Sequence, residues 1–156
     1  VTGFSFSSYL NLVRLGVPED DITTILMADH GLQLYGNAVI ANTDFAKSNP
    51  DIVKKFLSAV GSGWKDAIKS PKTAAAALVK RNPAADAALE QRRLQLAINA
   101  NVLTDYVKAN GMGRIDKDRF ALAIKQLGET YDYKTAPDAK LYFTSAYLPD
   151  GGILLQ

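Results

Sequence analysis

Cysteine is absent from this chain, and histidine occurs only once, as His30. A chain without cysteine forms no disulfide, carries no thiolate nucleophile and offers no sulfur ligand to a metal ion. His30 has no second histidine with which to share a metal, and the neighbouring Asp29 and Gly31 are typical of a turn. We therefore interpret His30 as an exposed turn residue and expect no metal site.

Long apolar runs and clusters of one charge are also missing. No apolar segment approaches the roughly 20 residues that a helix needs to span a bilayer. The 18 basic and 16 acidic residues leave a net charge of only +2. The densest basic pairs, at 80–81 and 92–93, are interrupted by acidic and apolar residues and indicate solvated helix faces. We therefore expect no nucleic-acid partner and no binding to a membrane surface.

The beginning of the chain lacks an initiator methionine and the features of a signal peptide. Val1 is followed by neither a basic segment nor a cleavage pattern. With 156 residues, of which 47% are hydrophobic, the chain is long enough to build one sizeable core. We expect one domain or a piece of a larger protein, and interpret the chain as the mature remainder of something longer.

Prolines preceded by capping residues punctuate the chain at regular intervals. Pro50, Pro71 and Pro83 each follow an asparagine or a serine, a pattern that predicts the start of a helix. The first of these three helices carries an apolar stripe at helical spacing, formed by Ile52, Phe56, Val60 and Trp64. We expect Trp64 to be largely buried and most of residues 43–131 to be helical.

Further helices are predicted from single capping residues. Ser7 or Ser8 should cap a first helix, which Gly16 should end in a left-handed conformation. Thr104 and Asp116 should begin two short helices nearer the C-terminus, because their side-chain oxygens can accept hydrogen bonds from free backbone N–H groups.

Short apolar segments predict a few strands between the helices. Residues 1–6, 22–27 and 37–41 have the length and the apolar content of short strands. Residues 134–156 contain two prolines and three aromatic residues, and predict an irregular packed tail that frays after residue 150.

The segment 34–42 joins the short first part of the chain to the long helical part. Tyr35, Gly36 and Asn37 combine an aromatic ring, a permissive glycine and a carboxamide at the mouth of a predicted strand. Such residues suit a hinge that is lined for a ligand. A simple strand start with a packed Tyr35 is the alternative, which the local residues taken alone favour.

No catalytic set is evident in the sequence. Ser5, Ser7 and Ser8 have no basic side chain beside them that could activate a hydroxyl. The segment 111–113 carries two glycines but lacks the preceding strand and the third glycine of a dinucleotide-binding loop. We therefore expect no cofactor and no enzymatic activity.

Five segments occur in an order that resembles a known family. They are residues 2–8, 28–37, 45–57, 63–64 and 143–149. The most specific parts are the Tyr35-Gly36-Asn37 segment, the helix start within 45–57 and the final Leu148-Pro149. In this order the chain resembles the C-terminal half of a bacterial ABC-transporter substrate-binding protein. The group is the one related to thiamine-pyrimidine synthases and to nitrate-, sulfonate- and taurine-binding proteins.

The resemblance implies an α/β fold, namely the two-lobed periplasmic-binding-protein fold of type II. This chain would supply its C-terminal portion, which is mostly helical with a few short strands. Residues 1–34 would end the second lobe, residues 35–42 would form the hinge and the returning strand, and residues 43–156 would form the helical part of the first lobe. The N-terminal half of that fold has no counterpart in the chain.

The resemblance also implies a function, which is solute capture for an ABC importer. The ligand would be a small organic molecule, such as a pyrimidine-like or another small nitrogen or sulfur compound. The partner would be the membrane permease, and the location would be the periplasm, with a signal peptide in the missing N-terminal part. The alternatives are an enzyme like the thiamine-pyrimidine synthases and a sensory ligand-binding module.

The residues expected to bind the ligand are those that the resemblance places at the cleft and the hinge. They are Thr2, Phe4, Ser5, Tyr35, Gly36 and Asn37. An aromatic ring could stack on a planar ligand, and Asn37 offers both a donor and an acceptor. Because the strands at 1–6 and 37–41 would lack their neighbours, we also expect this chain to associate with a second copy of itself.

Overall fold

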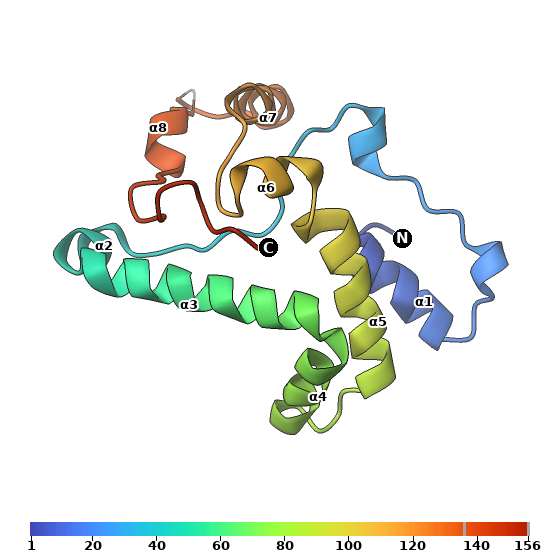
Figure 1. Cartoon of the computed structure of the whole chain (residues 1–156). Helices are drawn as coiled ribbons and strands as arrows, with labels where there is room; N and C mark the ends of the chain where they lie inside the picture. Colours follow the sequence, from blue (N-terminus) through green and yellow to red (C-terminus); the bar gives the residue numbers. More distant parts are fainter. Residues whose placement is uncertain (136, 156) are drawn as a thin grey trace.

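The computed structural model describes residues 1–135 and 137–155 and is built almost entirely of helices (Figure 1). The α-helices are α1 (Leu10–Arg14), α2 (Thr43–Ser48), α3 (Pro50–Lys69), α4 (Pro71–Arg81), α5 (Ala87–Ala97), α6 (Asp105–Asn110), α7 (Lys117–Thr130) and α8 (Ala139–Tyr142). Shorter helical turns are η1 (Ser5–Tyr9), η2 (Glu19–Asp21), η3 (Met27–His30) and η4 (Ile98–Val102).

The helices form two groups on either side of α3. At the C-terminal end of α3 the chain turns into α4, which packs along α5, and α5 in turn contacts η1 ahead of α1. The helices α6, α7 and α8 lie on the other side of α3 in Figure 1, and the C-terminal segment passes between them and α3. This arrangement brings α3, α4, α5 and η1 around one shared space.

The fully covered core is small. The large side chains that are completely buried in the described part of the chain are Leu10 and Ile98. By contrast, Ile52 and Phe56 on α3 are 54% and 55% exposed. The apolar stripe predicted for α3 is therefore only partly covered. Trp64 is intermediate in exposure, so it is mostly but not completely covered, because the small side chains facing its indole leave part of the ring open.

The helix starts predicted at Pro50 and Pro71 are confirmed, since these prolines occupy the first turns of α3 and α4. The start predicted at Pro83 is wrong. The helix α5 begins later, where the carboxylate of Asp86 accepts a hydrogen bond of 2.7 Å from a backbone N–H of its first turn. Asn82 ends α4 instead, so the capping role passes to the carboxylate four residues further on.

Four other predicted helix ends depend equally on local interactions. The caps at Thr104 and Asp116 are confirmed, because both side chains accept first-turn N–H groups, at 3.2 and 2.8 Å. Gly16 follows α1 with a φ of 90°, as predicted for a left-handed helix end. The cap predicted at Ser7 or Ser8 is wrong, because both residues lie inside the π-helical turn η1.

None of the strands predicted at 1–6, 22–27 and 37–41 forms in the described residues. Ile22 and Leu26 do have extended backbone angles, with φ and ψ of −107° and 108° and of −85° and 123°. A strand also needs a neighbour that completes its ladder of hydrogen bonds, and no such neighbour lies beside these segments. The described part of the chain is therefore largely helical, as expected, but it does not show the strands of the expected α/β fold.

The C-terminal segment packs against the middle of α3. Ile153 is buried and exchanges two backbone hydrogen bonds with Met112, of 2.8 and 3.0 Å, in an isolated antiparallel bridge. The same side chain lies over Gly61, where a Cβ atom would overlap it. The fraying predicted after Asp150 is wrong, because Ile153 and Leu155 are both buried.

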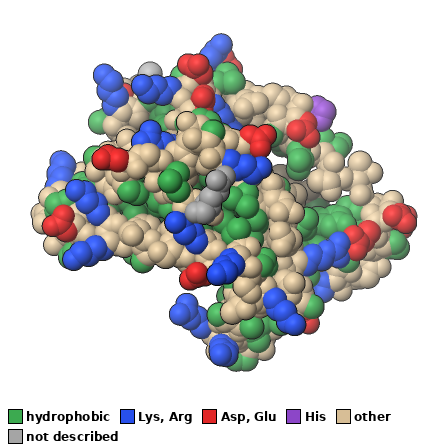
Figure 2. Space-filling view, in the orientation of Figure 1, with side chains coloured by type: hydrophobic (Ala, Val, Ile, Leu, Met, Phe, Trp, Pro, Cys, Tyr) green, Lys and Arg blue, Asp and Glu red, His purple; other side chains and the backbone are tan. Residues whose placement is uncertain are grey.

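The surface carries both signs of charge. In Figure 2, basic and acidic side chains are dispersed over the face in view, with apolar patches between them. This distribution agrees with the small net charge of +2. Among the residues described, no helix is both long enough and apolar enough to cross a membrane.

Candidate functional site

Tyr35 is anchored at the N-terminal end of α7. The backbone N–H of Asp116 donates a hydrogen bond of 2.8 Å to the Tyr35 hydroxyl. This hydroxyl also lies 3.5 Å from the carbonyl oxygen of Asp116. The guanidinium of Arg119 lies over the ring, 4.7 Å from its centroid. The ring of Phe120 approaches it edge-on, with 6.2 Å between centroids. Tyr35 is thus held in place although it remains 37% exposed.

Polar side chains of α7 also bind the backbone just before this tyrosine. Arg119 donates a hydrogen bond of 2.9 Å to the carbonyl oxygen of Leu34. Gln126 donates to the carbonyl oxygen of Gly31 at 2.7 Å. An extended segment without a strand partner thus finds its hydrogen bonds on a helix. We call this arrangement, in which Arg119 and Gln126 hold residues 31–35, the α7 clamp.

The two residues that follow the clamp are open to solvent. A Cβ atom on Gly36 would meet no atom within 4 Å, and Gly36 is not among the glycines with positive φ. In this conformation Gly36 therefore does not use the backbone angles that only a glycine adopts readily. The Asn37 side chain is exposed, and no hydrogen bond to it occurs within the described residues. Its donor and acceptor are available to a ligand.

The other predicted site residues lie at the start of η1. The ring of Phe4 stacks on that of Phe6, with 5.1 Å between centroids and 15° between planes. Thr2 is exposed and Ser5 is partly exposed. In the described part of the chain, no hydrogen bond and no ring contact joins these residues to the segment 35–37. The structure therefore shows two separate clusters, and their union in one cleft stays a prediction.

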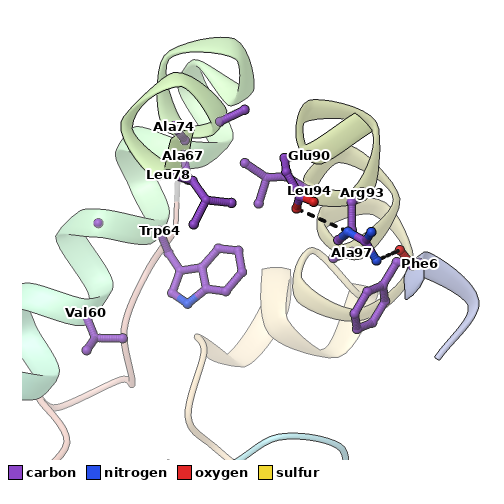
Figure 3. Close-up of a pocket in the computed structure, with 12 residues that line it drawn as sticks. Phe6, Val60, Trp64, Ala67, Ala74, Leu78, Glu90, Arg93, Leu94 and Ala97 are labelled. Atoms are coloured by element: carbon purple, nitrogen blue, oxygen red, sulfur yellow. Dashed lines mark hydrogen bonds and ion pairs between the residues drawn. The ribbon is translucent and has the colours of Figure 1, made fainter. Parts of the chain in front are cut away.

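An open groove of about 410 Å³ lies between α3, α4, α5 and η1, and we call it the Trp64 groove (Figure 3). Its walls are mostly apolar and include Val60, Trp64, Ala74, Leu78, Leu94 and Ala97. The indole of Trp64 projects from α3 toward α5, and the ring of Phe6 lies at the far end. The space remains because Ala74 and Ala97, on the facing helices, are too small to fill it.

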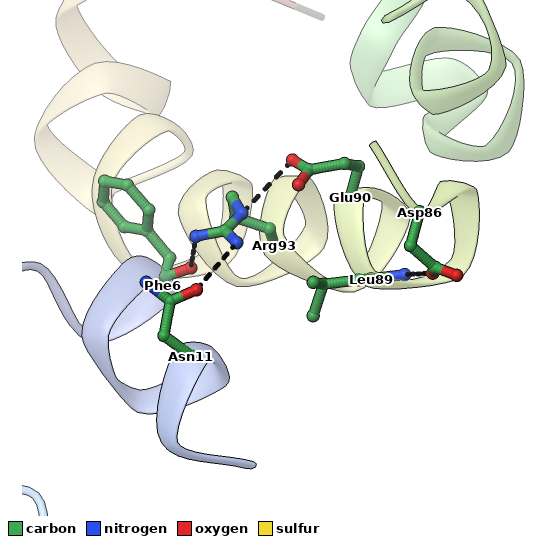
Figure 4. A network of polar contacts seen from close by, with 6 residues as sticks. All are labelled: Phe6, Asn11, Asp86, Leu89, Glu90 and Arg93. Atoms are coloured by element: carbon green, nitrogen blue, oxygen red, sulfur yellow. Dashed lines mark hydrogen bonds and ion pairs between the residues drawn. The ribbon is translucent and has the colours of Figure 1, made fainter. Parts of the chain in front are cut away.

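A charged pair on α5 lines the same groove (Figure 4). The Nε of Arg93 lies 3.2 Å from the carboxylate of Glu90, and the two side chains are only 22% and 19% exposed. Arg93 also donates to the carbonyl oxygen of Phe6 and to Oδ1 of Asn11, each at 3.4 Å. Arg93 therefore ties α5 to η1 and α1, and Glu90 balances its charge.

A second charged cluster fastens the N-terminal segment to the outer side of α5. The guanidinium of Arg92 pairs with Glu19 at 2.5 Å, and the hydroxyl of Tyr9 donates to the same carboxylate oxygen. These two hydrogen bonds, first that of Arg92 and then that of Tyr9, lower the pKa of Glu19 to about 2. The hydrogen bond to Glu19 in turn raises the pKa of Tyr9.

The Trp64 groove has no counterpart among the residues predicted from the sequence, where Trp64 is assigned to a filled core. The signal available in the sequence is the alanine-rich segment 74–77, since small residues opposite an indole leave space. That signal becomes readable only when the turn at Ser70 is known to place α4 against the end of α3. Which residues face Trp64 depends on the tertiary structure, and the spacing of residues along one helix does not predict it.

The single histidine, His30, belongs to neither of the two clusters. His30 is exposed at the end of η3, so its interpretation as an exposed turn residue is confirmed. Among residues 1–135 and 137–155, no three histidine or acidic side chains gather closely enough to hold a metal ion.

Residues 3–74 match the family model described as NMT1/THI5 like. The matched segment begins before η1 and ends in the first turn of α4, so it includes Phe4, Tyr35, Asn37 and Trp64. The helices α5 to α8 lie outside it. No curated protein and no solved structure was found to match the chain.

Proposed function

We propose that the chain is part of a substrate-binding protein of an ABC importer, on the premise that residues 3–74 match the NMT1/THI5-like family model, in agreement with the sequence resemblance. It captures a small organic molecule and presents it to a membrane permease. The family match carries the proposal, because this family includes such solute-binding proteins. The largely helical architecture supports the further proposal that the chain is the C-terminal portion of a two-lobed binding protein.

Asn37 is the best-placed polar group of the proposed site. The α7 clamp holds the backbone up to Tyr35, two residues before Asn37, so the segment that carries the Asn37 amide is anchored at one end. A carboxamide in a fixed position can donate to and accept from one planar ligand at the same time. Pre-organisation of this kind reduces the entropy lost on binding. The hydroxyls of Thr2 and Ser5, together with the ring of Phe4, supply further contacts in this proposal.

An uncharged ligand suits these residues better than an anion. None of the six proposed site residues is basic. Arg119 lies over Tyr35, but its guanidinium already donates to the carbonyl oxygen of Leu34. An anion such as nitrate or a sulfonate would therefore lack a free cation, whereas a neutral pyrimidine could satisfy Asn37. The same residues offer hydrogen-bonding groups and no nucleophile–base pair, which favours binding over catalysis.

The proposed partner and location follow from this role. A ligand that binds with micromolar affinity releases about 8 kcal/mol, which is enough to select one conformation for recognition by a permease. In this proposal the protein acts in the periplasm.

Isothermal titration calorimetry of the purified protein tests the proposal with three probes, namely 2-aminopyrimidine, taurine and nitrate. We expect the neutral pyrimidine to bind at least tenfold more tightly than the other two. Asn37→Ala should weaken that binding by about 1–3 kcal/mol, because it removes a donor and an acceptor. Asn101→Ala, at an exposed asparagine in η4, is the matched control. Absence of binding by all three probes, or equal affinities of the two variants, would contradict the proposal.

A further inference from the structure

The Trp64 groove has the size and the lining of a small-molecule site. Its volume of about 410 Å³ falls within the roughly 300–1,000 Å³ that ligand pockets usually occupy. Apolar side chains from three helices form most of its surface, and an indole ring projects into it (Figure 3). A planar aromatic molecule could lie against that indole, since stacked or edge-on aromatic pairs are favourable beyond their buried area.

Two hydrogen-bonding groups of the groove have no partner among the described residues. The indole N–H of Trp64 donates to no protein atom there, although it borders the open space. The carboxylate of Glu90 uses one oxygen for Arg93 and leaves the other without a hydrogen bond. The groove thus offers one donor and one acceptor, which a ligand with an N–H and a separate ring nitrogen could satisfy.

The charges at the groove favour an uncharged ligand. Glu90 and Arg93 form a pair whose net charge is zero, and about four-fifths of each side chain is covered. Arg93 is already shared among Glu90, Phe6 and Asn11, so it has little capacity to balance an anion. An added charge in such a partly dry site would remain uncompensated, which is costly.

We propose that the Trp64 groove is a second binding site, which takes a small, planar, uncharged aromatic molecule carrying a hydrogen-bond donor. The groove is built on α3, α4, α5 and η1, whereas the Asn37 site lies beside α7. The two sites share no lining residue, so this proposal does not depend on the transport function. Occupancy of the groove would also brace α5 against α3, because the ligand contacts both helices.

Two glycines with free space around them, one in the groove and one outside it, provide a test variant and a matched control. Gly63 lines the groove, and a Cβ atom there would meet nothing within 4 Å. Gly63→Leu should therefore place a side chain in the groove without a clash at its Cβ atom. Gly128 on α7 is equally unobstructed and lies outside the groove, so Gly128→Leu makes the same change elsewhere.

A second pair of variants tests the same groove in case a variant of the first pair does not fold. Ala74→Leu reduces the groove from its α4 wall, and Ala76→Leu places the same side chain at an exposed position of the same helix that does not line the groove. Circular dichroism of all four variants checks that they keep the helical content of the parent protein.

The binding experiment uses benzimidazole as the neutral probe and benzoate as the anionic one. Trp64 is the only tryptophan of the chain, so its indole N–H gives a single resonance in a ¹H–¹⁵N spectrum. We expect benzimidazole to shift this resonance saturably, and benzoate to bind at least tenfold more weakly. Gly63→Leu and Ala74→Leu should each weaken benzimidazole binding at least tenfold, while Gly128→Leu and Ala76→Leu should not.

Three results would overturn the inference. The first is the absence of a saturable shift with benzimidazole. The second is benzoate binding as tightly as benzimidazole. The third is unchanged affinity in the folded groove-filling variants. Loss of binding in Asn37→Ala but not in Gly63→Leu would assign the probe to the other site and refute this one alone.

Discussion

The guanidinium of Arg119 lies 4.7 Å from the centroid of the Tyr35 ring and donates a hydrogen bond of 2.9 Å to the carbonyl oxygen of Leu34. One side chain of α7 therefore holds both a ring and the backbone preceding it. The extended segment before Asn37 is ordered by this helix in place of a neighbouring strand. Its order thus depends on contacts between residues that are distant in the sequence.

The hydroxyl of Tyr35 should contribute measurably to stability. Tyr35→Phe leaves the N–H of Asp116 without its acceptor and should cost about 0.5–1.5 kcal/mol in free energy of unfolding. Tyr35→Ala should cost more, because it also removes the ring from Arg119 and Phe120. Urea unfolding of both variants measures these losses. Stabilities equal to that of the parent protein would show that the clamp contributes nothing.

Two glycines of α3 should respond oppositely to the same substitution. Gly61→Ala places a Cβ atom in the side chain of Ile153 and should cost about 1–3 kcal/mol. Gly63→Ala meets no atom within 4 Å and should gain up to about 1 kcal/mol from helix propensity alone. Thermal or urea unfolding distinguishes the two. A gain at both positions would mean that Ile153 moves aside without cost.

The cluster of Tyr9, Glu19 and Arg92 should give stability a defined dependence on pH. Its hydrogen bonds lower the pKa of Glu19 from 4.5 to about 2. Because the folded pKa is the lower one, the ionised carboxylate stabilises the fold at and above pH 4.5, and this contribution disappears as the pH falls toward 2. We expect Glu19→Gln to be less stable than the parent protein at neutral pH.

The difference between Glu19→Gln and the parent protein should shrink on acidification. Urea midpoints measured from pH 7 down to pH 2 check this, with high salt as a control that should also reduce the difference. A difference that is independent of pH would contradict the role assigned to the carboxylate.

Residues 37–41 should mediate self-association. Val39 and Ile40 are 57% and 91% exposed on a segment whose backbone lacks a strand partner. Such a segment can pair with its copy in a second chain. Light scattering should therefore detect a dimer or larger species that Ile40→Lys reduces. Leu141→Lys, at another highly exposed apolar residue, 80% exposed on α8, is the control. A monomer in the parent protein would refute the expectation.

Features determined by adjacent residues are the ones that sequence reasoning predicted well. The starts at Pro50 and Pro71 and the caps at Thr104 and Asp116 need only groups within one turn of helix. The cap at Asp86 escaped prediction because Pro83 offered a competing signal three residues earlier. Local patterns thus predict that a helix begins in this region. They do not predict which of two possible caps marks its first residue.

Features determined by partners were predicted poorly. Residues 22–27 and 37–41 have the composition of strands, yet a strand also requires a second strand beside it. Trp64 fits an apolar stripe, but its cover depends on the size of alanines contributed by α4 and α5. Likewise, no pattern around Tyr35 predicts Arg119 as its neighbour. These relations become visible only when the helices are placed in space.

The bridge between Met112 and Ile153 closes the chain into a loop that contains α7 and α8. Opening the bridge frees Ile153 from Gly61, and it releases one end of the segment that carries the α7 clamp. The amide protons of α7 and of residues 31–35 should therefore exchange with solvent as one cooperative unit, and not one by one. A cut near the C-terminus would then loosen the segment around Tyr35, although the two regions are far apart in the sequence.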